Sequence, residues 1–149
     1  MFNKTVIFLI GLLSVVLYSN AQKNYANILK LHKWATESIT AAKPIDLNKT
    51  GKPSTDLLAQ SSACIKDDIL VFKDKGVLIR DDNKVLCNMG SMANGSWRLN
   101  KDILQLSYGG KTKASFFKIT SLDDHQLTIV SNMPFVPGGV NVTYVYKAL

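Results

Sequence analysis

Residues 95–110, which read GSWRLNKDILQLSYGG, carry the pattern that decides the fold. Two short apolar runs, residues 95–99 and 103–108, are separated by the turn-forming sequence Asn-Lys-Asp. In the second run apolar side chains alternate with polar ones, and a period of two is typical of a β-strand with one face toward a core. The stretch therefore predicts an antiparallel hairpin with one buried face.

Short apolar runs separated by turn signals continue along most of the chain. The signals recur roughly every 8–12 residues, which is typical of an antiparallel sandwich or barrel. No long segment has the helical period, so the sequence predicts an all-β fold. The further predicted strands are residues 34–40, 69–72, 77–80, 114–122, 127–130 and 140–146. The side chains expected to point inward from residues 103–108 and from the last strand are Leu104, Leu106, Tyr108, Val142, Tyr144 and Tyr146.

Two segments lie outside this pattern. Residues 23–31 fit either a short helical turn or an irregular lead into the first strand. Residues 41–63 are the least regular part of the chain, and within them residues 55–60 fit one capped helical turn.

The first 21 residues have the layout of a secretory signal peptide. Lys4 precedes an apolar run over residues 6–17, and Ser19-Asn20-Ala21 places small residues before an expected cleavage site at Gln22. The alternative is a retained anchor, for which this run is short. No cysteine follows the run to accept a lipid anchor. We therefore expect one mature domain, residues 22–149, that is secreted or periplasmic without a stable membrane anchor.

Composition and charge exclude a disordered chain and argue against a nucleic-acid-binding protein. The chain has 149 residues, 46% of them hydrophobic, and a formal net charge of +7, which excludes disorder and fits one domain. Only Arg80 and Arg98 among its 18 basic residues are arginines, and the lysines are scattered. Nucleic-acid sites cluster basic side chains and favour arginine, so no nucleic-acid partner is expected.

The two cysteines, Cys64 and Cys87, predict a structural disulfide, because an exported chain meets an oxidising compartment. A metal site needs more ligands than two cysteines, and no CxxC redox pair is present. The doublets Asp67-Asp68, Asp81-Asp82 and Asp123-Asp124 lack the ligand spacing of a calcium loop and are interpreted as turn residues. We expect neither a metal nor a cofactor.

Catalysis is not predicted from the residues available. His32 and His125 are far apart and belong to no metal-binding or triad motif. Glu37 is interpreted as a surface carboxylate on a strand, and His125 as a solvated turn residue. The protein is therefore expected not to be an enzyme.

Several motifs together resemble a known family. They are Leu31-His32-Lys33-Trp34, the run Cys64-Ile65-Lys66-Asp67-Asp68 before Leu70-Val71-Phe72, Cys87, and Gly95-Ser96-Trp97-Arg98-Leu99. This combination resembles the lipocalin-like domains of exported proteins of Bacteroidetes-type bacteria. Lipocalins usually have glycine two residues before the first-strand tryptophan, where this chain has His32, so the resemblance is to the broader lipocalin-like group.

The resemblance implies an up-and-down antiparallel β-barrel of about eight strands with an apolar interior. The short N-terminal helical or irregular segment predicted at residues 23–31 would precede this barrel. A barrel of this size is filled by side chains or holds one small ligand, and both alternatives stay open here. Trp34 and Trp97 are expected to plug the core. The candidates to line a cavity are Phe72, Leu104, Leu106, Tyr108, Phe117, Phe135, Tyr144 and Tyr146.

Residues 132–139 form an unusually apolar loop, which fits either an exposed binding surface or a plug over the barrel end. Two functions follow. The first is non-catalytic binding of a small hydrophobic molecule inside the barrel. The alternative is a protein-interaction module with a packed barrel that docks through this loop.

Overall fold

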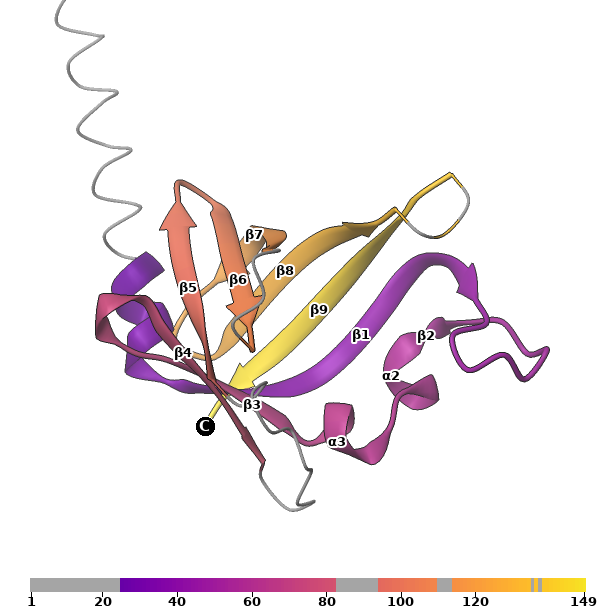
Figure 1. The fold of residues 1–149 in the computed structure, drawn as a ribbon, viewed down its shortest axis with the longest axis horizontal. Coiled ribbons are helices and arrows are strands. Elements are labelled where there is room, and N and C mark those ends of the chain that lie inside the picture. The colour runs from indigo at the N-terminus through magenta and orange to yellow at the C-terminus, as the bar shows by residue number, and fades with distance from the viewer. Residues whose placement is uncertain (1–24, 83–93, 110–113, 135, 137) are drawn as a thin grey trace, which may run out of the picture.

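The structure is a computed structural model that describes residues 25–82, 94–109, 114–134, 136 and 138–149. It is mostly β-sheet, with short helices (Figure 1). The strands are β1 (Lys33–Ile45), β2 (Ser54–Asp56), β3 (Asp68–Phe72), β4 (Val77–Asp82), β5 (Asn94–Asn100), β6 (Ile103–Tyr108), β7 (Ser115–Leu122), β8 (Gln126–Met133) and β9 (Val140–Ala148). The helices are residues 25–31, α2 (Leu57–Gln60), α3 (Ala63–Lys66) and a 3-10 turn, Asp74–Gly76.

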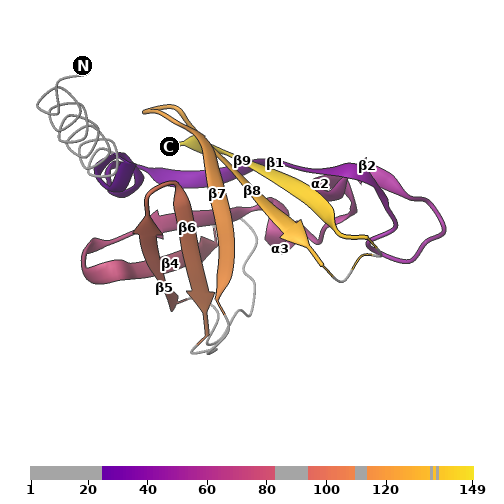
Figure 2. The same ribbon diagram turned by 90° about the horizontal axis from the view of Figure 1, so that it is seen from above.

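The sheet closes into a barrel of eight antiparallel strands, β1 and β3 to β9, as predicted. Strands β3 to β8 each pair with the next strand in sequence, and β1 pairs with both β3 and β9 (Figure 2). Closure leaves the barrel strands without a free edge along these pairings, which removes the usual risk of edge-to-edge association. Strand β2 was not predicted and pairs only with the outer part of β1.

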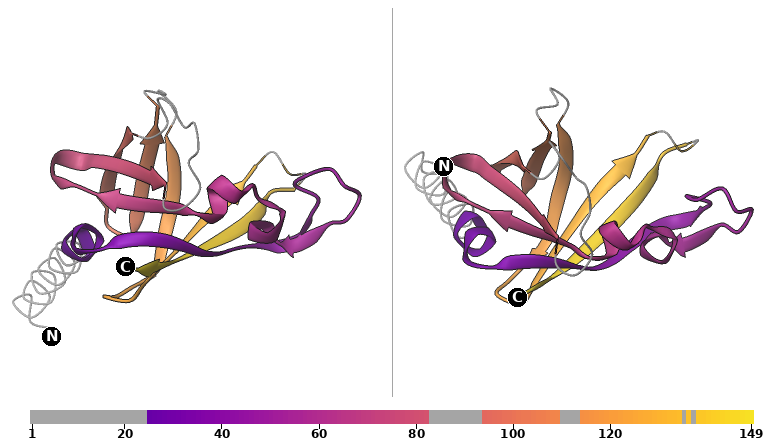
Figure 3. Two further views of the ribbon diagram at one scale, coloured as in Figure 1. Left: turned by 90° about the horizontal axis from the view of Figure 1, so that it is seen from below. Right: turned by 60° about the horizontal axis from the view of Figure 1, so that its bottom comes forward.

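Strand β1 is longer than the predicted residues 34–40 because it serves three neighbours. Residues 33–35 pair with β3 on one side, residues 34–41 pair with β9 on the other across a bulge between Thr36 and Ser38, and residues 40–45 pair with β2. Figure 3 shows β1 and β9 running together away from the barrel toward β2 and α2. Pro44 is accommodated in this outer part of β1, where proline is tolerated near a sheet edge.

Two apolar cores result. The main core fills one end of the barrel, and the second packs α2 against β1 and the start of β9. The buried residues of the main core are Leu29, Trp34, Leu70, Phe72, Leu78, Leu104, Leu106, Ile119, Leu127, Ile129 and Tyr146. Those of the second core are Ile39, Ala41, Leu57, Val140 and Val142. The predicted inward faces of β6 and β9 agree with the burial of Leu104, Leu106, Val142 and Tyr146, whereas Tyr108 and Tyr144 are half-buried like their neighbours on the strand.

The helix of residues 25–31 covers the filled end of the barrel (Figure 1). Leu29 and Trp34 are fully buried there, and the Trp34 indole Nε1 donates a hydrogen bond of 2.9 Å to the Leu29 carbonyl. A Lys30–Asp74 ion pair of 2.7 Å ties the same helix to the turn between β3 and β4. The N-terminal segment is therefore part of the domain's packing.

Three details differ from the sequence interpretation or sharpen it. Asp68 is not a turn residue: it begins β3 and is buried. Residues 41–63 are more ordered than expected, and the capped turn is confirmed, because the Asp56 carboxylate accepts a hydrogen bond from the Ala59 amide at the start of α2. The loop predicted at residues 132–139 is shorter, since β8 continues to Met133.

The predicted signal peptide, Cys87 and Phe135 lie outside the described residues. Within the residues that the structure describes, no helix has the length and apolar character needed to cross a membrane.

Candidate ligand site in the barrel

A cavity of about 190 Å³ lies at the end of the barrel remote from the covering helix. Asp68, Arg80 and Tyr108 stand at the ends of β3, β4 and β6 that point away from the turns at the filled end. The residues that line the cavity are Thr36, Ile39, Ile65, Asp68, Leu70, Arg80, Tyr108, Phe117, Tyr144 and Tyr146. The barrel is thus filled at one end and hollow at the other.

The structure divides the predicted cavity residues into two groups. Tyr108, Phe117, Tyr144 and Tyr146 line the cavity. The others whose positions are described, Phe72, Leu104 and Leu106, are buried in the main core below it. The alternation of apolar residues identifies inward side chains, but it does not say at which end of the barrel they lie.

The two tryptophans differ in burial. Trp34 is fully buried, whereas Trp97 is only half-buried and packs edge to face on Phe72, with 5.4 Å between ring centroids. The Trp97 indole Nε1 donates a hydrogen bond of 2.9 Å to the Lys73 carbonyl. Trp97 therefore links β5 to the end of β3 through these two contacts, and it packs against the outside of the main core.

The polar centre of the cavity is an ion pair between Asp68 and Arg80. The Arg80 Nε donates a hydrogen bond of 2.8 Å to Asp68 Oδ2, and Nη2 donates to the same oxygen. The side chains are 9% and 17% exposed, so both charges are largely removed from water. The guanidinium carbon also lies 5.6 Å from the centroid of the Tyr108 ring, within the range of a cation–π contact.

Strand register explains why these two side chains meet. Arg80 is directly opposite Leu70 in the β3–β4 ladder, and Asp68 lies two residues from Leu70 on the same strand. Residues two apart share a face, so Asp68 and Arg80 are diagonal neighbours on the inward face. The sequence interpretation missed both residues. Continuing the alternation of Leu70, Phe72 and Leu78 by one step on each strand would have identified them.

Three tyrosines surround this pair. Burial raises the pKa of Tyr108 to about 12, and it also raises the pKa values of Tyr144 and Tyr146. A hydrogen bond with the Ser131 side chain opposes the shift at Tyr144. The Phe117 and Tyr144 rings pack edge to face with 5.6 Å between centroids. At neutral pH the site therefore combines apolar ring faces with protonated hydroxyl groups.

Larger hollows lie on the outer surface. One of about 430 Å³ runs along β5 and β6, where the side chains of Ser96 and Arg98 are exposed. Its lining is mostly polar, unlike that of a typical small-molecule site. The cavity inside the barrel is the better candidate for a small-molecule site, because its walls are mainly aromatic and aliphatic.

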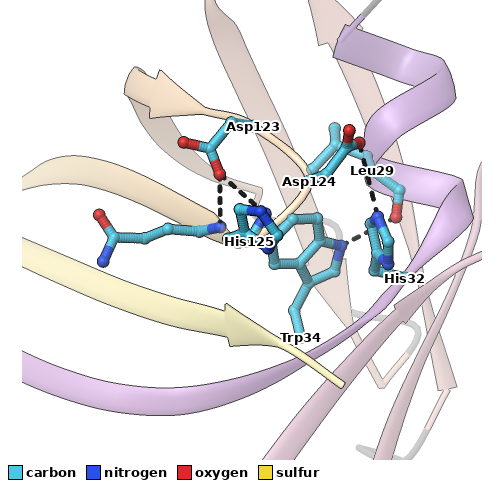
Figure 4. Close-up of polar contacts among 7 residues, drawn as sticks. Leu29, His32, Trp34, Asp123, Asp124 and His125 are labelled. Carbon is cyan, nitrogen blue, oxygen red and sulfur yellow. Dashed lines mark hydrogen bonds and ion pairs between the residues drawn. The ribbon is translucent and has the colours of Figure 1, made fainter.

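The remaining polar candidates lie away from the cavity. His125 is exposed in the β7–β8 turn, as predicted, and Glu37 is exposed on β1. The His32 ring packs edge to face on Trp34, and its Nε2 lies 3.6 Å from Asp124 Oδ1, at the filled end (Figure 4). Across the described ranges, no three histidine, cysteine or acidic side chains gather as metal ligands would.

The loop after β8 contributes to the second core. Met133 and Val136 are half-buried and pack against it. This packing covers part of the apolar loop for which the sequence left two interpretations open, a binding surface and a plug over the barrel end. Docking through residues 132–139 stays a prediction.

Comparison with known proteins fits this geometry. A family model described as a lipocalin-like domain matches residues 31–129, from the end of the N-terminal helix into β8. No curated protein matches the chain at a significant level. The matched region covers well over half of the sequence and includes most of the barrel strands. The chain belongs to the lipocalin-like domain family.

Proposed function

We propose that this domain binds one small, mostly apolar molecule inside the barrel, without covalent chemistry. The observation that carries the proposal is the cavity of about 190 Å³, with aromatic and aliphatic walls and a few convergent polar groups. Such a combination is the usual character of a small-molecule site. Membership of the lipocalin-like family supports it, because the barrel of that family suggests a ligand-binding domain.

The volume limits the ligand. Drug-sized molecules need cavities of roughly 300 Å³ or more, whereas a dry cavity of about 150 Å³ accepts benzene. The cavity of about 190 Å³ therefore fits a molecule built on a single ring, or an aliphatic chain of similar size.

The test is to fill the cavity. Thr36 lines it from β1, and its hydroxyl makes only a long hydrogen bond of 3.3 Å to the Asp68 carbonyl. In Thr36→Phe the new ring would occupy the space of the ligand. The matched control is Thr120→Phe on β7, where the threonine is exposed.

The measurement is an NMR titration of the full domain with benzyl alcohol. We expect amide shifts at Tyr144 and Tyr146 in the wild type and in Thr120→Phe, and none in Thr36→Phe. Equal shifts in Thr36→Phe, or no shifts around the cavity in the wild type, would overturn the proposal. Native mass spectrometry of protein purified from its own host then asks which molecule it retains.

We also propose that the domain is an exported bacterial protein of the Bacteroidetes type, released by cleavage before Gln22 and carrying a Cys64–Cys87 disulfide. The basis is the sequence: the leader layout, the resemblance and the two cysteines. N-terminal sequencing of the mature protein checks the cleavage. The mass after alkylation, with and without prior reduction, checks the disulfide. A mature chain that begins at Met1, or two alkylated cysteines without reduction, would contradict these expectations.

A further inference from the structure

We infer that the ligand is electrically neutral and carries a hydrogen-bond-accepting oxygen, which binds beside Arg80 while the apolar body lies against the aromatic wall. The inference rests on the proposed function, because it describes the ligand of the same cavity. It follows from the charges, the donors and the size of that cavity.

The charges of the lining cancel. Of the ten described residues that line the cavity, only Asp68 and Arg80 are ionisable at neutral pH, and they form an ion pair with each other. An anionic ligand would place a second negative charge near Asp68, and a cationic ligand would place a second positive charge near Arg80. Either ligand would also leave water for a partly dry site without a free counter-charge, which is costly. A neutral ligand avoids both costs.

The hydrogen-bonding capacity that Arg80 offers to a ligand is that of a donor. Arg80 gives its Nε and Nη2 groups to Asp68, and among the described residues its Nη1 group donates no hydrogen bond. Three tyrosine hydroxyl groups, from Tyr108, Tyr144 and Tyr146, belong to the same lining. A carbonyl, amide or alcohol oxygen can accept from such groups, whereas a pure hydrocarbon offers them no acceptor.

The apolar part of the lining determines the size and shape of the ligand's apolar body. Phe117 and Tyr144 present a pair of rings packed edge to face, and Leu70 and Ile39 are aliphatic and buried. A flat ring or a short branched chain fits this wall and the volume of about 190 Å³.

Three probes of nearly equal shape separate the possibilities: benzamide, benzoate and benzamidinium. At pH 7 they are neutral, negative and positive. We measure each dissociation constant by NMR titration and locate the site from the shifts at Tyr144 and Tyr146. We expect benzamide to bind at least about tenfold more tightly than either ion, since an unpaired charge in a dry site is strongly disfavoured.

Two substitutions then shift the charge balance. Asp68→Asn leaves the Arg80 charge alone and should make benzoate the tightest of the three probes. Arg80→Gln removes the positive charge beside Asp68 and should favour benzamidinium. The matched controls are Asp81→Asn and Arg98→Gln, which change exposed residues on β4 and β5 and should keep the wild-type order.

Each outcome decides something. Benzoate or benzamidinium binding most tightly to the wild type at the cavity overturns the neutral-ligand inference while the proposed function stands. Absence of binding by all three probes, together with a failed benzyl alcohol titration, overturns both. If either cavity variant does not fold, the wild-type order of the three probes decides the inference by itself.

Discussion

Burying Asp68 beside Arg80 costs desolvation on both side chains, and their mutual hydrogen bonds offset that cost only while both partners are present. An apolar pair of similar volume would stabilise this position equally well or better. The pair is therefore better explained by what it does in the cavity than by the stability of the fold. Its place on the inward face, among apolar residues, agrees with that explanation.

This leads to a double-mutant prediction. Arg80→Met leaves the Asp68 carboxylate without its ion-pair partner and should lower the free energy of unfolding by about 3 kcal/mol. Adding Asp68→Leu removes that charge, and the double variant should return to within about 1 kcal/mol of the wild type. Urea unfolding of the four proteins measures the cycle. A double variant less stable than Arg80→Met would show that the pair stabilises the fold outright.

Tyr108 predicts a loss of stability at high pH. Burial raises its pKa from the ordinary value of 10.0 to about 12 in the folded state. Between these values the unfolded chain releases the proton while the folded chain keeps it, so the free energy of unfolding falls as the pH rises. The contribution is fully present below about pH 10, and between about 2 and 3 kcal/mol of it is lost by about pH 12.

The lysines and the other tyrosines titrate in the same range, so the comparison is with Tyr108→Phe. Its free energy of unfolding should fall less steeply than that of the wild type between about pH 10 and 12, as measured by urea unfolding at closely spaced pH values. Equal slopes in the two proteins would mean that the Tyr108 hydroxyl is not raised in pKa.

At the scale of elements, strands β5 and β6 approach each other unusually closely at Gly95. A Cβ built at this glycine would lie 2.2 Å from the Ser107 carbonyl oxygen, closer than any real contact. The obstructing atom belongs to the backbone of β6 and cannot rotate away. Gly95 thus permits the pairing of Gly95 with Tyr108, which brings the end of β6 to the cavity.

Gly95→Ala should therefore destabilise the domain by about 2 kcal/mol or more, because the β5–β6 ladder must separate to admit the methyl group. Ser96→Ala, at the neighbouring exposed position, is the control and should change stability by less than about 0.5 kcal/mol. Urea unfolding gives both values. If Gly95→Ala were as stable as Ser96→Ala, the close approach would be absent in solution.

The strands show which parts of the fold can be read from the sequence. The run Ile103–Tyr108 was predicted with its bounds and its faces, because alternation and flanking turn residues agree there. Strand β2 and the outer half of β1 carry no such pattern; they form because α2 and β9 supply tertiary partners. The same alternation predicted inward positions for Tyr108, Tyr144 and Tyr146, which line the cavity, whereas Phe117 was a candidate only because it is aromatic. Asp68 was missed because a charged residue beside an apolar run looks like its end. Arg80 ends the predicted strand 77–80 and was missed because it was considered only as one of the scattered basic residues.

At the scale of the whole molecule, the barrel depends on its last strand. Strand β9 pairs with both β1 and β8 and contributes Val142 and Tyr146 to the two cores. The match to the family model ends before this strand begins. The spacing of turn residues along the sequence predicts a meander of antiparallel strands. The pairing of β1 with β9 closes this meander into a barrel around the cavity.

A chain that ends at Gly139 should therefore fail to form the barrel. It leaves the edges of β1 and β8 unpaired, and it removes Tyr144 and Tyr146 from the cavity. Loss of the near-UV circular dichroism signal and of a cooperative urea transition measures this. A synthetic peptide of residues 138–149, added in excess, should restore both the near-UV signal and the cooperative transition by pairing with the edges of β1 and β8. The strand docks through backbone hydrogen bonds and through three buried side chains, Val140, Val142 and Tyr146. A peptide of the same composition in scrambled order is the control and should restore neither. A truncated chain that unfolds cooperatively without the peptide would show that β9 is an accessory to the barrel and that closure is not what holds the cavity open.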